Sequence, residues 1–301
     1  MKLTILTCTY NSEATIKQFI AAAHAAALSL ANQVPFDLEY NILVIDDHSE
    51  DGTVDNLRTL GSHDRNLQVF RLSRRVGQHA ATLEGLAQSD GDFIFLIDSD
   101  LEEDPVWLME FWEVMTEMGV DSVHGRFESR HGPIVRKLGS KLFWAGLKFL
   151  GAIELPTNAT AARLLTRRFV DAALVNRRAS RILAVIFSLA GPSVAVRVDK
   201  SFKGWSSYSV WQKSSIAIQH IIIESRQLWW RMTFCLVMTS VVLVIATATS
   251  VLVGLSLLVV VSMASGAIAA LLLSAIFAVG LMIRSLIENQ LDRRPVLLTI
   301  V

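Results

Sequence analysis

The chain has 301 residues, and its 28 basic and 28 acidic side chains give a formal net charge of zero. A nucleic-acid-binding domain is expected to be strongly basic, so this balance argues against nucleic acid as a partner. The two cysteines, Cys8 and Cys235, have neither a disulfide nor a metal-ligand spacing, which fits a reducing compartment. The N-terminus enters an apolar strand directly, without the basic and long apolar regions of a signal peptide.

Apolar segments alternate with helical segments over the first ~125 residues, which predicts a doubly wound α/β sheet with helices on both faces. The expected strands are Leu3–Thr7, Asn41–Ile45, Leu67–Leu72, Phe93–Ile97 and Ser122–His124, and the expected helices are Ala14–Leu30, Val54–Leu60, Gln78–Gln88 and Pro105–Met118. Ligands of such sheets bind beyond the carboxyl ends of the strands. The polar residues that follow each strand are therefore the first candidates for a site.

The polar residues after the fourth expected strand are Asp98-Ser99-Asp100. Two carboxylates on one loop offer the oxygen ligands that Mg²⁺ or Mn²⁺ prefers, and a metal held there can neutralise a departing diphosphate. An Asp-x-Asp pair also occurs in solvated turns and helix caps, but here Asp104-Pro105 already supplies a cap for the next helix. No Walker A or Gly-x-Gly-x-x-Gly sequence is present, which argues against a P-loop NTPase or a dinucleotide oxidoreductase.

Four polar segments follow one another along the chain. They are Thr9-Tyr10-Asn11, Val44-Ile45-Asp46-Asp47 with Asp51-Gly52-Thr53, Ser73-Arg74-Arg75-Val76-Gly77, and Asp98-Ser99-Asp100-Leu101-Glu102-Glu103-Asp104-Pro105. In sequence and order they resemble the GT-A-fold glycosyltransferases of family 2, and within them the polyprenyl-phosphate glycosyltransferases similar to dolichol-phosphate mannose synthase and bacterial undecaprenyl-phosphate enzymes. The resemblance covers essentially the whole chain and is strongest over residues 1–130.

This resemblance implies an inverting glycosyltransferase whose donor is a nucleotide-diphosphate sugar. The donor-binding residues that it implies are Thr9, Tyr10, Asp46, Arg74, Asp98 and Asp100. Asp98 and Asp100 would hold the diphosphate through Mg²⁺ or Mn²⁺, and Asp46 would bind the base or ribose. Tyr10 would line the base pocket. Simpler interpretations remain open for two of them, since Asp46 can cap the following turn and Arg74 can be a solvated charge.

The acceptor that the resemblance implies is a polyprenyl phosphate, undecaprenyl phosphate in a bacterial source. Arg126 and Arg136 match arginines of the family that orient the lipid phosphate, which a guanidinium group binds by paired hydrogen bonds. A phosphate is already ionised at neutral pH and needs no general base. Asp100, Arg126 and Arg136 would therefore catalyse the transfer by positioning and electrostatics. Arg163 is a further candidate for the active site, with a surface role equally open.

Several positions depart from the residues that are usual in the family. They are Cys8 in place of proline, Ser12 in place of glutamate, His48 in place of glycine, Glu102 in place of glutamine, and Ser201 and Ser207 in place of two basic residues. These positions surround the expected donor pocket. The nucleotide and the sugar therefore stay open, although the Asp98 and Asp100 pair is intact.

A long apolar segment occupies the C-terminal part of the chain. Between Arg231 and Arg284 lie 52 residues without an acidic, basic or histidine side chain. A helix crosses a bilayer core in about 20 residues, so this length predicts two transmembrane helices, at about 232–253 and 257–283. Flanking arginines predict that the catalytic domain and both termini lie on the cytoplasmic side of the inner membrane. A buried hairpin in a soluble core is the alternative.

The expected domain organisation follows from these segments. A GT-A domain would cover residues 1–210, a juxtamembrane helix 211–231, the hairpin 232–284 and a cytoplasmic tail 285–301. A basic amphipathic helix at about 134–150 suits contact with membrane lipids, and an ordinary core-facing helix is its alternative. Gly266 and Ala270 have a small-xxx-small spacing, which is a hint of a homo-oligomer.

Two other functions are compatible with the sequence. One is a family 2 transferase with another lipid or glycan as acceptor, although a processive polysaccharide synthase is disfavoured because the Gln-x-x-Arg-Trp sequence is missing. The other is a non-catalytic membrane scaffold that binds nucleotide. The intact Asp98 and Asp100 favour an enzyme.

Overall fold

The computed structural model describes residues 1–127, 159–177, 183–198, 226–254 and 297–300, with shorter stretches between 261 and 280. Arg136, the expected interfacial helix at 134–150 and the segment with Ser201 and Ser207 lie outside the described residues. The chain divides into two compact units. The first consists of Met1–His131, Leu155–Ser207 and Pro295–Val301, and the second of Gly132–Glu154 and Tyr208–Arg294.

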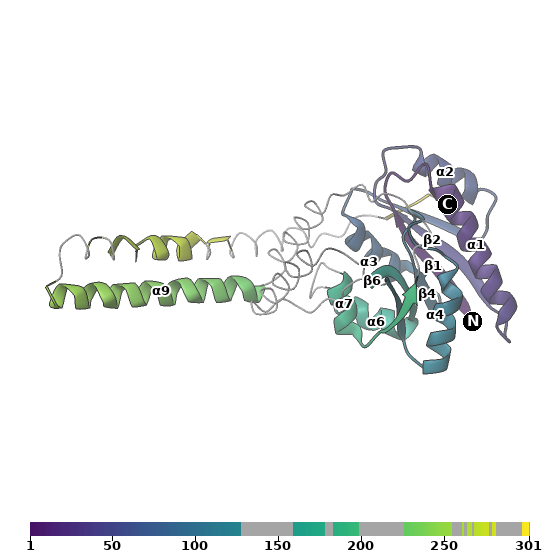
Figure 1. The fold of residues 1–301 in the computed structure, drawn as a ribbon. Helices are drawn as coiled ribbons and strands as arrows, with labels where there is room; N and C mark the ends of the chain where they lie inside the picture. The colour runs from purple at the N-terminus through teal and green to yellow at the C-terminus, as the bar shows by residue number, and fades with distance from the viewer. Residues whose placement is uncertain are drawn as a thin grey trace, which may run out of the picture. The chain divides into compact units, whose positions relative to one another are not determined.

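The first unit is built on an eight-stranded sheet with the order β7-β5-β6-β4-β1-β2-β3-β8 (Figure 1). The strands are β1 (Lys2–Thr9), β2 (Glu39–Asp46), β3 (Leu67–Leu72), β4 (Phe93–Leu96), β5 (Ser122–Phe127), β6 (Ala159–Thr166), β7 (Val194–Val198) and β8 (Leu297–Thr299). β1 pairs in parallel with β2 and β4, and β2 with β3, whereas β6 is antiparallel to both β4 and β5. The carboxyl ends of β1 to β5 therefore open at one edge of the sheet.

Helices cover both faces of this sheet (Figure 1). They are α1 (Ile16–Gln33), α2 (Thr53–Gly61) and α4 (Trp107–Met118) on one face, and α3 (Gln78–Gln88), α6 (Arg167–Val175) and α7 (Leu183–Ala190) on the other. Successive side chains of β1 point to opposite faces of the sheet. Ile5 packs in the core under one set of helices, and Leu6 packs in the core under the other. Burial on both faces explains why the strands are almost continuously apolar.

The predicted α/β sheet is confirmed, and the five strands expected in the first half of the chain are all present. β5 is longer than expected: it continues to Phe127, with a shift of register between His124 and Arg126. This shift comes from pairing with β6, a strand that lies far along the chain, so the local sequence did not predict it.

The helix α9 (Arg226–Leu252) belongs to the second unit and is followed by Gly254, which has a φ of 72°. Hydroxyl groups occur along it, and those of Thr239, Ser240 and Thr247 each donate to a carbonyl one turn earlier. After the turn, the longest helical run that the structure describes is 268–276.

Within the part of the chain that the structure describes, no helix has the combined length and apolar character needed to cross a membrane. This finding contradicts the predicted multi-pass localisation in the inner membrane, and that prediction is corrected. The prediction relied on the absence of charge between Arg231 and Arg284, which does not by itself make two continuous spanning helices.

Candidate functional site

The carboxyl edge of the sheet brings the predicted donor residues together. Thr9 and Asp46 are register partners at the ends of β1 and β2, and the N–H group of Asp47 donates to the Thr9 carbonyl at 2.9 Å. The hydroxyl of Ser99 donates to the carbonyl of Cys8 at 3.3 Å. The Asp98-Ser99-Asp100 loop therefore lies beside the end of β1, as the sequence predicted.

The backbone is strained in the same loops. Among the described residues, the non-glycine positions with positive φ are Asn11 (50°), His48 (65°) and Leu101 (62°). They follow β1, β2 and β4, and such outliers tend to gather at functional sites. His48 stands where the family often has glycine, and its left-handed backbone explains that preference. Its ring nitrogen Nδ1 lies 3.1 Å from the Leu72 carbonyl, which ties the loop to the end of β3.

Asp98 and Asp100 form the expected carboxylate pair. Asp98 is half-buried and accepts a hydrogen bond of 2.7 Å from the Gln78 side chain, whereas Asp100 is exposed and accepts one of 2.9 Å from the N–H group of Glu102. Burial, and then the charge of Asp100, raises the pKa of Asp98 to about 6. A cation between the two carboxylates would remove this repulsion.

The donor set fits a divalent cation that is shared with a ligand. Among the described residues, no group of three or more His, Cys, Asp or Glu side chains is placed to enclose a metal ion. Mg²⁺ is commonly held by only one or two carboxylates together with the phosphates of a substrate. Asp98 and Asp100 would supply the protein's share of such a site.

Asp46 and its neighbour Asp47 have different surroundings. The Asp46 side chain is fully buried, accepts from the N–H group of Ser49 and lies 3.4 Å from Nε of Arg71. Burial raises its pKa, while the Ser49 and Arg71 contacts lower it. The simpler interpretation, a cap for the turn, is therefore present in the structure. Contact between Asp46 and a base or ribose stays a prediction.

Tyr10 carries a contact that the sequence did not suggest. The guanidinium carbon of Arg75 lies 3.8 Å from the centre of the Tyr10 ring. The neighbouring Arg74 is exposed, and its role at the donor stays a prediction. Thr9 is buried, and its hydroxyl has no hydrogen-bond partner among the described residues. Arg75 thus covers one face of the Tyr10 ring, and the expected role of Tyr10 in a base pocket stays a prediction.

Basic side chains gather on β5, β6 and β7, where Arg163 of β6 is the register partner of Leu96 at the end of β4. Arg126 is exposed and has Ala159 of β6 and Arg197 of β7 as register partners. Burial, and then the charges of Arg163 and Arg126, lowers the pKa of His124 to about 4, so these cations lie close to one another. The role of Arg126 at the acceptor phosphate stays a prediction.

Arg163 is buried, with 6% of its surface exposed, and this excludes the surface role left open above. Its guanidinium carbon lies 4.9 Å from the centre of the Phe187 ring. Burial lowers its pKa to about 10, and the charge of Glu103 acts in the opposite direction. The structure thus places the Arg163 cation on β6, opposite Leu96 at the end of β4, with an aromatic ring and a carboxyl group nearby.

Glu103 is a site residue that the sequence analysis missed. It is 7% exposed; its Oε1 accepts from the N–H group of Ala161 at 2.8 Å, and its Oε2 has no partner among the described residues. Burial, and then repulsion by Asp98, raises its pKa to about 8. Four residues of this region were missed: Asp47, Arg75, Gln78 and Glu103. Each lies in a segment that carried the family resemblance or directly beside one, and this position was the one signal in the sequence that could have found them.

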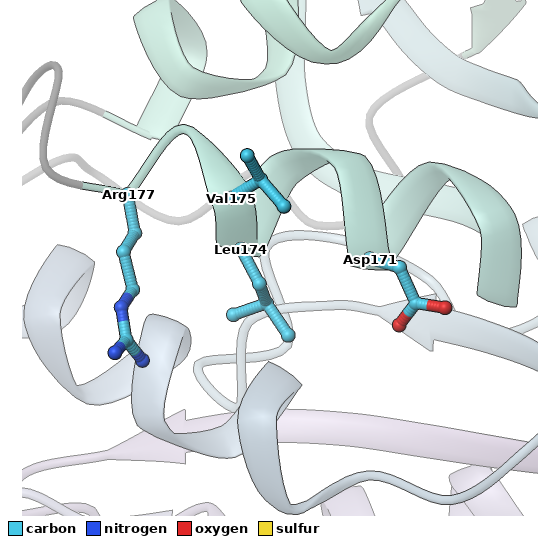
Figure 2. A pocket seen from close by; sticks show the side chains of 4 residues that line it. All are labelled: Asp171, Leu174, Val175 and Arg177. Carbon is cyan, nitrogen blue, oxygen red and sulfur yellow. The ribbon is translucent and has the colours of Figure 1, made fainter.

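A surface hollow lies along α6 and the residues just after it. Asp171, Leu174, Val175 and Arg177 line it, and Figure 2 shows the Leu174 side chain between the two charged ones. None of the predicted site residues that the structure describes lines it. The chemistry of the carboxyl edge therefore does not extend to this hollow.

Comparisons with known proteins show the family of this chain. The family model described as glycosyl transferase family 2 matches residues 4–173. A Mycobacterium tuberculosis protein described as "Putative glycosyltransferases" is 32% identical over 222 residues, which are 73% of this chain and 63% of the relative. An undecaprenyl-phosphate 4-deoxy-4-formamido-L-arabinose transferase of Pseudomonas fluorescens is 26% identical over 211 residues, or 69% of this chain and 60% of that protein. The matched region thus spans less than two thirds of either relative.

A structural comparison supports the fold. The mannosyl-3-phosphoglycerate synthase of Rubrobacter xylanophilus has a TM-score of 0.50 with 18% identity, over 75% of this chain and 74% of that one. This agreement is with a GT-A-like mixed α/β sheet, as predicted. Together with the family model and the named relatives, it confirms the resemblance seen in the sequence: the chain belongs to glycosyl transferase family 2.

Proposed function

We propose that this glycosyltransferase transfers a sugar from a nucleotide-diphosphate sugar to a polyprenyl phosphate, with undecaprenyl phosphate as the acceptor. The observation that carries the proposal is the meeting of the Asp98-Ser99-Asp100 loop with the ends of β1 and β2, together with basic side chains on the strands β5 and β6 that continue the same sheet. The names of relatives from Pseudomonas fluorescens, Aeromonas hydrophila and Proteus mirabilis, all undecaprenyl-phosphate sugar transferases, support the choice of acceptor.

The donor half of the site would bind the diphosphate at the carboxylate pair. Asp98 and Asp100 would hold Mg²⁺ or Mn²⁺, which when bound neutralises charge on the departing diphosphate. The side-chain amide of Gln78 donates to Oδ1 of Asp98 and thereby fixes the direction of the other carboxylate oxygen of Asp98. Tyr10, with Arg75 against its ring, would lie at the nucleoside end of the donor.

The acceptor half would bind the lipid phosphate at the basic group. Arg126 is exposed at the end of β5 and can form paired hydrogen bonds with a phosphate. The buried Arg163 adds positive potential at short range, where the effective dielectric constant is low. An ionised phosphate attacks without a general base, so these residues would act by position and charge.

The test is transfer of radiolabel from a panel of nucleotide sugars to undecaprenyl phosphate by the full chain, with Mg²⁺ or Mn²⁺ and with EDTA. We expect labelled lipid with one donor and only with metal. Asp100→Ala should abolish transfer, while Asp55→Ala, at an acid that is 83% exposed on α2, should leave it unchanged. Label on a different lipid or glycan would refute the acceptor, and failure to bind any nucleotide would point to a scaffold.

A further inference from the structure

Three arginines of β5, β6 and β7 lie on the same face of the sheet. Phe127 and Val198 both pack against or within the core under α1, α2 and α4. Side chains of a strand alternate between its two faces, so the residues directly before them, Arg126 and Arg197, point to the opposite face, which α6 and α7 cover. Arg163 shares that face, because its guanidinium group contacts an aromatic ring of α7.

Strand pairing brings these three arginines close together. Arg126 and Arg197 are register partners near the ends of the parallel strands β5 and β7. Arg163 is the register partner of His124, which lies two residues before Arg126 on β5. Burial, and then the charges of Arg163 and Arg126, lowers the pKa of His124, so both charges act at its ring. Arg126, Arg163 and Arg197 therefore form one arginine cluster.

Without a ligand this arrangement is costly. Like charges on neighbouring strands repel each other. Arg163 is 6% exposed, and its guanidinium group forms no hydrogen bond or ion pair within the part of the chain that the structure describes. Buried donors without partners cost free energy, and the charge of Glu103 acts on this arginine without forming an ion pair with it. A bound anion would reduce the repulsion and supply hydrogen-bond acceptors.

We propose that Arg197 joins Arg126 in binding the phosphate group of the acceptor, and that the arginine cluster makes the acceptor half selective for a phosphate monoester. The proposal rests on the proposed function, which did not include Arg197. A phosphate monoester carries roughly two negative charges at neutral pH, whereas an alcohol carries none. Arg126 and Arg197 are both exposed, so each can reach a ligand with the paired hydrogen bonds of a guanidinium group. The buried Arg163 adds a third positive charge.

The competing role for Arg197 is protection of a sheet edge. β7 is the last strand in the order of the sheet, and charged side chains on an edge strand discourage pairing with another molecule. The two roles differ in what can replace arginine. Lysine keeps the charge that protects an edge but lacks the planar group that pairs with a phosphate. Only the phosphate role couples Arg197 to Arg126, since both would then contact one ligand.

The experiment measures binding of undecaprenyl phosphate to the full chain in detergent micelles. Undecaprenol, which lacks the phosphate, and glycerol 3-phosphate, which lacks the lipid, are measured beside it. The variants are R197A, R197K, R126A, the double variant R126A/R197A, and R65A as a control at an exposed arginine before β3. Titration with inorganic pyrophosphate and Mn²⁺ probes the donor half separately.

We expect R197A and R197K to bind undecaprenyl phosphate about tenfold less tightly than the wild type, as for the loss of hydrogen bonds between charged groups. The loss in the double variant should be smaller than the product of the two single losses. Weak binding of undecaprenol and the affinity for pyrophosphate should be unchanged in every variant. R65A should match the wild type, and all variants should elute with it in size-exclusion chromatography.

Four results would overturn the role of Arg197: wild-type affinity for undecaprenyl phosphate in R197A, wild-type affinity in R197K, single losses that multiply in the double variant, or aggregation of R197A that accounts for its loss. Tight binding of glycerol 3-phosphate with the same losses would support the phosphate role and refute the lipid acceptor of the proposed function. A wild-type chain that binds neither phosphate would overturn both.

Discussion

Glu103 is an acid that the fold keeps protonated near neutral pH. Burial and the nearby Asp98 raise its pKa to about 8, while one of its oxygens has no partner among the described residues. Between the ordinary value of 4.5 and about 8 the folded chain therefore binds more protons than the unfolded chain. By linkage, the stability contributed by this group is present at low pH and is lost as the pH rises through that window.

Glu103→Gln should remove this loss, because glutamine stays neutral and keeps a carbonyl oxygen for the Ala161 N–H group. In metal-free buffer we expect the variant to be more stable than the wild type at pH 8, by roughly 1–3 kcal/mol, and equally stable at pH 4.5. Urea unfolding at both pH values measures the difference. Glu110→Gln, at an exposed acid of α4, is the control and should show no such dependence. An equal effect at both pH values would contradict the assigned protonation.

Arg126 tests the division between donor and acceptor sides. Arg126→Ala should lower kcat/KM for undecaprenyl phosphate about 10- to 100-fold, as expected for lost hydrogen bonds between charged groups, and should leave the affinity for nucleotide unchanged. Steady-state kinetics with varied lipid and a separate nucleotide titration measure the two quantities. Arg58→Ala, on the exposed surface of α2, serves as the control. Equal losses on both sides would refute the assigned role.

At the scale of single residues the sequence was a partial guide to the site. It predicted that Asp98, Asp100 and Tyr10 follow strands, where ligands of a doubly wound sheet bind, and the structure places them after β4 and β1. It chose Asp46 over Asp47 by the family resemblance alone, since adjacent acids look equivalent until one is seen buried in its own turn and the other bound to the loop of 73–77. The contact of Arg75 with Tyr10 depends on that loop and has no local signal.

Among the elements, α3 packs unusually close to the sheet. A Cβ atom added at Gly85 would lie 2.6 Å from Cδ1 of Leu6 and 2.9 Å from Cγ1 of Ile45, closer than real Cβ contacts allow. The glycine therefore lets the helix approach β1 and β2, and with it the Gln78 end that contacts Asp98.

Gly85→Ala should destabilise the chain by about 1–3 kcal/mol through overpacking, although alanine favours helix by up to ~1 kcal/mol over glycine. Chemical denaturation measures the change. In the double variant with Leu6→Ala, the added methyl group would occupy space left by the leucine. The stability losses of the two single variants, Gly85→Ala and Leu6→Ala, should then sum to more than the stability loss of the double variant. Strict additivity would show that the contact with Leu6 is not the cause.

The elements themselves were predictable where one segment carries its own pattern. The first five strands and four helices of the chain follow from apolar periodicity and from turn residues between them. β7 and β8 lack such signals, because each is a short edge strand that exists through pairing with a strand far away in the sequence. Local sequence was also insufficient for the apolar C-terminal segment. Composition alone led there to the prediction of membrane-spanning helices, which the described helices contradict.

For the whole molecule, the sheet joins both ends of the chain. β8 pairs antiparallel with β3, and the N–H group of Ile300 donates to the Val69 carbonyl at 2.9 Å. In an antiparallel ladder, hydrogen-bonded and non-hydrogen-bonded pairs alternate. Leu298, opposite Arg71, is therefore in the next hydrogen-bonded pair, while Thr299, opposite Phe70, directs its N–H group away from β3.

This alternation gives a matched pair of proline variants. Leu298→Pro removes a ladder hydrogen bond beside Arg71, whose guanidinium group donates to the Ser49 carbonyl at 2.8 Å and lies next to Asp46. Thr299→Pro leaves the ladder bonds in place, since its N–H group faces outward. We expect Leu298→Pro to cost about 1–3 kcal/mol more stability than Thr299→Pro, with faster amide hydrogen exchange along β3. If both variants lose the same stability, β8 does not hold β3 by this ladder, and the C-terminal strand has no part in supporting the turn at Asp46.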